Sequence, residues 1–230
     1  LTQVIGPFLP EDPVLRGFME RSYEILNNHP VNLRRAAEGK RKANSLWYWG
    51  AGTKPSLPGF TEKTGLKGAM ISAVDLLKGI AVGAGMQVYQ VPGATGSLDT
   101  NWEGKAQAAI DALLKDGCDF AYIHLEAPDE MGHQGLVKEK VQSIEYLDSR
   151  VVAPICHAME QAGEDYRILV LPDHPPPIRI RTHSSDPVPY VLYDSTRQEK
   201  KRAHYTEAEA QATGIFYPQG YVLLDKLLNK

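Results

Sequence analysis

The stretch Ile168-Leu169-Val170-Leu171-Pro172-Asp173-His174 joins a strand-forming run to two side chains that ligate metals. A short apolar run bounded by a proline is typical of a strand that is buried on both faces. Because Asp173 and His174 follow directly, we expect this strand to end at a site. Neighbouring residues of an extended chain point apart, so both can serve only if ions or a bridging phosphate lie between them.

A second carboxylate and imidazole pair follows another expected strand, residues 120–125. Asp129 and His133 are four positions apart, so one helical turn or a tight loop can direct both side chains at one ion. His183 lies in the polar loop beyond the first stretch. Oxygen and imidazole ligands suit manganese, zinc or iron better than calcium or magnesium. The sequence therefore predicts a transition-metal site.

Strands and helices alternate from residue 69 onward, which is typical of an α/β fold. The predicted strands are residues 69–71, 86–91, 120–125, 168–171 and 188–193. The predicted helices are residues 73–84, 101–114, 136–162 (with a kink expected at Pro154) and 220–228. We expect a three-layer sandwich with a mostly parallel sheet. Sites in such sheets form outside the carboxyl ends of strands, where both ligand pairs fall.

The first part of the chain follows another pattern. Hydrophobic spacing predicts a helix over residues 11–28. A short strand is expected at residues 46–49. Residues 50–66 are rich in glycine and proline, and they predict a loop-rich boundary.

Several blocks of the sequence resemble one family in the same order along the chain. They are Leu46-Trp47-Tyr48-Trp49-Gly50-Ala51-Gly52, Ile71-Ser72-Ala73-Val74-Asp75-Leu76-Leu77-Lys78-Gly79, Glu126-Ala127-Pro128-Asp129-Glu130-Met131-Gly132-His133, Leu171-Pro172-Asp173-His174-Pro175 and Arg181-Thr182-His183-Ser184-Ser185-Asp186-Pro187-Val188-Pro189. Together they resemble the archaeal-type cofactor-independent phosphoglycerate mutases of the alkaline phosphatase superfamily. The resemblance covers nearly the whole chain.

The resemblance implies a two-metal site that moves a phosphoryl group between 3-phosphoglycerate and 2-phosphoglycerate through a phosphoserine. It implies that Asp129, His133 and His183 hold one divalent ion. Asp173 and His174 would hold the other, together with an aspartate and the nucleophilic serine. Manganese is the expected metal, with zinc as the alternative.

The resemblance also suggests residues that contact the substrate. Lys78 resembles the phosphate-side lysine of the family, although a solvated helix lysine is equally consistent with the sequence. Lys40, Arg41 and Trp49 resemble the substrate-clamping insert, whereas a basic run is more often a solvated face. His124 is expected to be a structural residue of its strand. Glu126 could support a ligating histidine or have a purely structural role.

No aspartate at a strand end followed by a serine-bearing helix precedes Asp129. We therefore expect a C-terminal fragment that is inactive alone and prone to self-association. Residues 1–63 would be part of an inserted substrate-binding domain, and residues 64–230 the metal-binding domain.

The composition gives no indication of a nucleic-acid or membrane partner. Apolar residues make up 43% of the chain, which suffices for a core, and the net charge of −3 gives no reason to expect nucleic acid or a membrane surface. The two cysteines form no disulfide framework, so a cytoplasmic location is expected. Two other interpretations stay open. One is a related phosphotransferase or phosphatase, such as a proposed homoserine kinase, and the other is a non-catalytic metal-binding domain.

Overall fold

The computed structural model describes residues 6, 9–48, 52–197 and 204–228, and the chain divides into two compact units, residues 1–55 and 56–230. Short helix α3 (Phe60–Thr64) belongs to the second unit. The Phe60 N–H donates to the Ala84 carbonyl over 2.7 Å, and the Phe60 ring stacks on Phe120 with ring centroids 5.1 Å apart. The assignment of residues 1–63 to an inserted domain stays a prediction.

In its described residues the first unit forms the α-helices α1 (Pro13–Leu26) and α2 (Pro30–Ala37). The helix predicted over residues 11–28 is confirmed. It begins after Asp12, whose carboxylate accepts hydrogen bonds from two backbone N–H groups of the first turn. Helix α2 was not predicted. The His29-Pro30 pair that ends α1 also starts α2, because the His29 ring caps the helix and Pro30 takes its first position.

The strand predicted at residues 46–49 is wrong over the described residues 46–48, and Trp49 lies outside the described residues. The backbone here bonds to side chains instead of to a neighbouring strand. The buried Asn32 carboxamide pairs with both the N–H and the carbonyl of Ala43, and the Leu46 N–H donates to the Ser22 hydroxyl. These contacts fix the segment in an extended form that joins no sheet.

The second unit is built on a parallel sheet of β1 (Gly68–Ile71), β2 (Gln87–Tyr89) and β3 (Phe120–Ile123). The strand order is β2-β1-β3, with Ala69 opposite Gln87 on one side and Ala121 on the other. All four residues of the central strand β1 are buried. The α/β class with a parallel sheet, predicted from the alternation, is confirmed.

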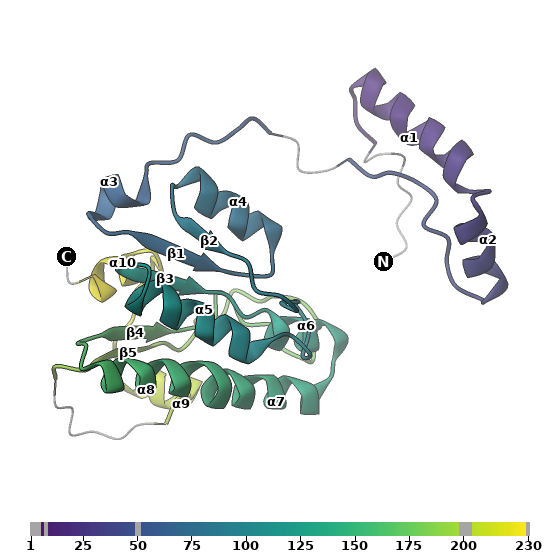
Figure 1. Cartoon of the computed structure of the whole chain (residues 1–230). Helices are drawn as coiled ribbons and strands as arrows, with labels where there is room; N and C mark the ends of the chain where they lie inside the picture. The colour runs from purple at the N-terminus through teal and green to yellow at the C-terminus, as the bar shows by residue number, and fades with distance from the viewer. Residues whose placement is uncertain (1–5, 7–8, 49–51, 198–203, 229–230) are drawn as a thin grey trace. The chain divides into compact units, whose positions relative to one another are not determined.

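Helices cover both faces of this sheet (Figure 1). Helix α4 (Asp75–Gly83) contacts β1 and β2, and α5 (Trp102–Leu114) contacts β1 and β3. Alternate residues of β1 serve the two faces, since Ala69 and Ile71 belong to the core cluster with α5. Helix α5 begins as predicted at Asn101, whose side-chain oxygen accepts from the Gly104 N–H over 2.8 Å.

The helix predicted over residues 136–162 consists of three segments: α7 (Val137–Leu147), a π-helical turn (Asp148–Val152) and α8 (Ala153–Ala162). Pro154 explains the turn. A proline ring clashes with the carbonyl four residues earlier in a regular helix, and a wider π turn removes that contact. The Ala153 N–H accordingly donates to the Asp148 carbonyl, five residues back. The expected kink is therefore a π bulge.

The remaining strands, β4 (Arg167–Val170) and β5 (Val191–Asp194), form a separate antiparallel pair. Arg167 joins them through an ion pair of 2.7 Å with Asp194. Helix α9 (Glu207–Ala212) was not predicted, and α10 (Val222–Leu227) matches the predicted C-terminal helix. Among the described residues, no helix combines the length and apolar character needed to cross a membrane.

Candidate metal centre

Helix α6 (Ala127–Gln134) carries the first pair of candidate ligands. Pro128 lies in its first turn, and Gly135 ends it with a φ of 74°, in the left-handed region that glycine adopts at little cost. Asp129 and His133 therefore lie one turn apart on the same face. His133 Nε2 is 3.2 Å from Asp129 Oδ2.

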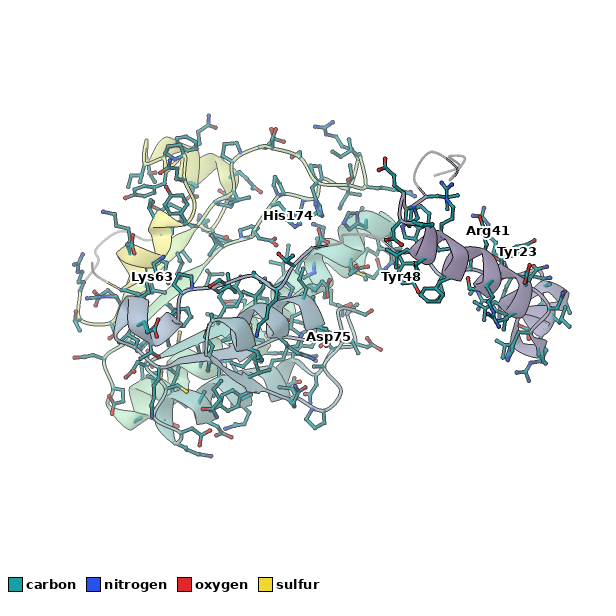
Figure 2. All side chains as sticks on the ribbon, turned by 90° about the horizontal axis from the view of Figure 1, so that it is seen from above. Tyr23, Arg41, Tyr48, Lys63, Asp75 and His174 are labelled. Carbon is teal, nitrogen blue, oxygen red and sulfur yellow. The ribbon has the colours of Figure 1, made fainter. Side chains whose placement is uncertain are left out.

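The loop after β4 brings the other candidates to the same place. His183 Nε2 lies 3.2 Å from Asp129 Oδ1 and 3.0 Å from His133 Nε2. The His174 ring, labelled in Figure 2, lies against the His183 ring with centroids 3.6 Å apart and planes tilted by 32°. Asp173 Oδ2 is 3.3 Å from His174 Nε2. All five residues singled out from the sequence as metal ligands thus lie in one cluster.

The backbone of Arg181 orients the His133 ring. Its carbonyl lies 3.0 Å from His133 Nδ1, an arrangement in which Nδ1–H is the donor and Nε2 keeps its lone pair. Arg181 has a φ of 51°, which makes it the one described non-glycine residue with a positive φ. Such a conformation is costly unless its surroundings stabilise it, and it occurs often at functional sites. Here it turns the carbonyl toward the imidazole, as outer partners of ligating histidines do.

The arrangement fits a divalent ion. Asp129, His133 and His183 each offer one ligand atom, and these atoms all lie within 4.8 Å of one another. Ligand atoms about 2.0–2.2 Å from a metal stand about 3.0–3.5 Å apart. The closest contacts here lie in that range, at 3.0 Å between His133 Nε2 and His183 Nε2 and 3.2 Å from Asp129 to each ring. Asp129 Oδ1 and one atom outside this set, His174 Nδ1, are buried without a hydrogen-bond partner and lie 3.8 Å apart. Buried polar atoms are rarely left unpaired, so their convergence indicates a cation site.

Lys140 of α7 fixes the start of α6 to the loop after β4. Its Nζ donates to the Pro128 carbonyl over 2.9 Å and to the Pro176 carbonyl over 3.3 Å. Burial lowers the pKa of this lysine, and the charge of Asp129 opposes the change. Gly132 allows the close approach, because a Cβ there would lie 3.0 Å from both Lys140 Nζ and the Pro176 carbonyl oxygen.

A buried lysine lies next to the end of β3. The Lys105 side chain of α5 is 1% exposed, and its Nζ lies 3.3 Å from the Thr95 carbonyl and 3.5 Å from the His124 carbonyl. Burial lowers the pKa of Lys105 to about 8, and the Glu126 carboxylate acts in the opposite direction. Burial likewise raises the pKa of Glu126, with a further contribution from Glu130. Lys105 thus connects the end of β3 to the loop before α5.

The lowered pKa of Lys105 predicts a rise in stability between pH 8.5 and 9.5. The unfolded chain holds the Lys105 proton up to about pH 10.4, whereas the folded chain releases it near pH 8. Since the unfolded state binds more protons in this window, the free energy of unfolding increases with pH, by about 1 kcal/mol per unit. Denaturant titrations of the metal-free chain at several pH values should show the increase. Lys105→Met should remove the part of the pH dependence that comes from Lys105. An equal slope in the variant would contradict the assignment.

The other residues named from the sequence lie elsewhere or have other partners. Lys78 of α4 pairs with Asp75 at 3.2 Å. Lys40 and Arg41 lie in the first unit, where Lys40 pairs with Glu38. Their roles, and that of Trp49 outside the described residues, stay predictions. His124 follows β3 directly, with Nδ1 3.5 Å from the Ser72 hydroxyl, and burial lowers its pKa.

Sequence reasoning missed Lys105, Lys140 and the Arg181 carbonyl. The burial of Lys105 could have been predicted, because it falls on the apolar side of α5 between Trp102 and Ala109. The orientation of the Arg181 carbonyl could not have been predicted, because a sequence does not show a positive φ at a non-glycine residue.

An α/β fold with carboxylates and imidazoles gathered after the carboxyl ends of β3 and β4, where they could hold a metal ion, is typical of metal-binding α/β domains. The chain belongs to the Metalloenzyme superfamily, whose sequence model matches residues 23–217.

Known relatives agree with the resemblance seen in the sequence. A protein of Methanothrix thermoacetophila named 2,3-bisphosphoglycerate-independent phosphoglycerate mutase is 54% identical over 182 residues, which cover 79% of this chain and 46% of that protein. A probable enzyme of the same name from Geobacter sulfurreducens is 48% identical over 213 residues, 92% of this chain and 53% of the relative. The chain thus spans about half the length of these relatives.

Two solved structures are similar. The PH0037 protein from Pyrococcus horikoshii has a TM-score of 0.74 and 31% identity, over 94% of this chain and 56% of that protein. The cofactor-independent phosphoglycerate mutase from Thermoplasma acidophilum has a TM-score of 0.52 and 26% identity, over 94% of this chain and 50% of that enzyme.

Proposed function

We propose that the chain is the metal-binding part of a 2,3-bisphosphoglycerate-independent phosphoglycerate mutase, which interconverts 3-phosphoglycerate and 2-phosphoglycerate. The observation that carries the proposal is the convergence of Asp129, His133 and His183 in a chain whose relatives bear that name. A cytoplasmic enzyme acting on a small phosphorylated metabolite fits the absence of a strongly basic composition.

The proposed ligand sets are Asp129, His133 and His183 for one divalent ion, and Asp173 with His174 for a second. Manganese is the preferred ion and zinc the alternative, since both accept mixed carboxylate and imidazole ligands. When bound, such a pair lowers the pKa of a nucleophile and neutralises charge on phosphoryl oxygens.

The residues of this chain have supporting parts in the proposal. Arg181 holds the lone pair of His133 toward the cluster, and Lys140 keeps α6 against the loop after β4. Lys78, Lys40, Arg41 and Trp49 are proposed to contact the substrate. The serine nucleophile that the resemblance implies has no match in residues 1–230, so we expect no mutase activity from this chain by itself.

The test compares two proteins: the chain of 230 residues, and the same chain fused to the part of the Methanothrix relative outside its match. Both should bind manganese or zinc, measured by elemental analysis after dialysis. Only the fusion should convert 3-phosphoglycerate to the 2-isomer in an assay coupled to enolase. A fusion that binds metal but releases inorganic phosphate instead would replace the mutase assignment with a phosphatase. Absence of metal from both would remove the proposal.

A further inference from the structure

The loop between β2 and α5, residues 90–101, is held in place by its own hydrogen bonds. The Asn101 N–H donates to the Gly93 carbonyl over 3.0 Å, which joins the two ends of the loop. The Thr95 N–H donates to the Thr100 hydroxyl over 2.9 Å and closes its middle. Since the loop follows the carboxyl end of a parallel strand, it lies at the same edge of the sheet as the candidate metal ligands. It can therefore serve as a fixed support at that edge.

Lys105 connects this loop to the end of β3. Its side chain is 1% exposed, and its Nζ donates to the Thr95 carbonyl over 3.3 Å and to the His124 carbonyl over 3.5 Å. The His124 N–H in turn donates to the Ile71 carbonyl of β1 over 2.9 Å. A lysine is rarely buried so completely unless its charge is paired, so the groups around the ammonium indicate what it does.

The carboxylate of Glu126 is the opposite charge near Lys105. Burial lowers the pKa of Lys105 and raises the pKa of Glu126, and in each case the charge of the other residue opposes the change. Glu126 directly precedes α6, but its side chain makes no capping hydrogen bond to the described residues of that helix. The carboxylate lies against Gly96 of the loop instead, where the Cβ of any other residue would collide with it. The Glu126 side chain is therefore directed at the loop.

The backbone of Glu126 begins α6 and holds Asp129, whose carboxylate converges with two imidazoles. The Glu126 carbonyl accepts hydrogen bonds from the Asp129 N–H over 2.9 Å and from the Glu130 N–H over 3.1 Å. A shift of residues 124–126 would therefore move the first turn of α6, and Asp129 with it. A continuous series of contacts thus runs from Lys105 to Asp129.

We propose that Lys105 is a positioning residue for Asp129. Its ammonium holds residues 124–126 against the 90–101 loop, so that α6 begins with Asp129 at its place in the candidate metal centre. The consequence for metal binding rests on the proposed function, whereas the positioning itself is a property of the metal-free chain. Charge alone predicts the opposite effect, because the ammonium repels a divalent cation and its removal would strengthen binding. The direction of the change in metal affinity therefore separates positioning from simple charge repulsion.

Amide hydrogen exchange of the metal-free chain tests the positioning. Lys105→Met keeps the length of the buried side chain but removes its charge and its donors. The amides of Asp129 and Glu130, which lie in the first turn of α6, should exchange at least about 10-fold faster in the variant. The amide of Lys115 at the end of α5 is the internal control and should change less than about 2-fold. Unchanged exchange at Asp129 and Glu130, or equally faster exchange at Lys115, would overturn the proposal.

Isothermal titration with Mn²⁺ and Zn²⁺ tests the consequence for the metal centre. Lys105→Met should bind either ion at least about 10-fold more weakly, as when a partner that orients a ligand is lost. The matched control is Lys115→Met, which removes the same charge from the end of α5, where the side chain is 67% exposed, and should change the affinity less than about 2-fold. An affinity of Lys105→Met equal to or higher than that of the parent would overturn the proposal. A parent chain that binds neither ion would remove the proposed function, and the exchange measurement would still decide the positioning.

A double-mutant cycle separates positioning from a general loss of stability. Glu126→Gln keeps the shape of the side chain and removes its charge. Because the two charges act together, Glu126→Gln should change the metal affinity at least about 3-fold less in the Lys105→Met background than in the parent. Trp102→Phe alters α5 one turn from Lys105 without removing its contacts, and it should stay within about 2-fold of the parent affinity. Independent effects of Glu126→Gln and Lys105→Met, or a loss in Trp102→Phe as large as that in Lys105→Met, would contradict the proposal.

Discussion

Asp129→Asn is expected to lower the affinity of the chain for Mn²⁺ or Zn²⁺ by more than about 100-fold. Loss of a partner that only supports a ligand already costs about 10–100-fold in metal affinity, and Asp129 is proposed as a ligand itself. Its Oδ2 lies 3.2 Å from His133 Nε2, and its Oδ1 lies 3.2 Å from His183 Nε2 and 3.8 Å from His174 Nδ1. An amide removes the negative charge at the centre of three imidazoles. Isothermal titration with each metal salt measures the loss.

Glu130→Gln is the matched control, since it removes one negative charge from the adjacent position of α6. Glu130 is absent from the group of residues whose ligand atoms converge, so its change should alter the affinity less than about 3-fold. Thermal unfolding gives an independent measure. A ligand at 100 times its dissociation constant stabilises a protein by about 2.7 kcal/mol, and Asp129→Asn should lose this increment. Affinities within about 3-fold for both variants would place the metal elsewhere.

The sequence was sufficient to predict features that depend on short-range pattern. The alternation of strands and helices from residue 69 gave the α/β class, because each apolar run has to be buried against a neighbouring layer. Asn101 gave the start of α5, since a side-chain cap acts on the next three residues. The pairing of Asp129 with His133 needed only helical spacing, and their position after a strand placed them at the same edge as Asp173.

Features that depend on tertiary contacts could not be predicted in this way. Residues 46–48 have the composition of a strand, but Ser22 binds the backbone of Leu46 and no partner strand is present in the described part of the chain. The left-handed conformation of Arg181 follows from the folded loop and not from its residue type. The open edges of β3 and β4 are also invisible in the sequence, because both runs have the pattern of strands that are fully paired.

Trp102→Ala is expected to lower the free energy of unfolding of the second unit by about 3–5 kcal/mol. The Trp102 side chain is 1% exposed, and its Nε1–H donates to the Leu98 carbonyl over 2.9 Å. Its ring meets Tyr146 of α7 edge to face, with centroids 5.9 Å apart, so it joins α5 to α7. Truncation leaves a cavity and an unpaired carbonyl, both of which destabilise the fold. Denaturant unfolding, followed by far-ultraviolet circular dichroism, gives the value.

Two companion variants separate the causes of this loss. Trp102→Phe keeps most of the ring contact with Tyr146 but removes the hydrogen bond to Leu98, and a loss of about 1–2 kcal/mol is expected. Phe216→Ala removes an aromatic ring that is 65% exposed and should stay within about 0.5 kcal/mol of the parent. Trp102 contacts Leu98 and Tyr146 and lies one turn before Lys105 on α5. Its effect on the candidate metal ligands therefore passes through the packing of α5. Variants that fold should therefore keep their metal affinity, and a large loss of affinity in Trp102→Phe would show that α5 positions the ligands directly.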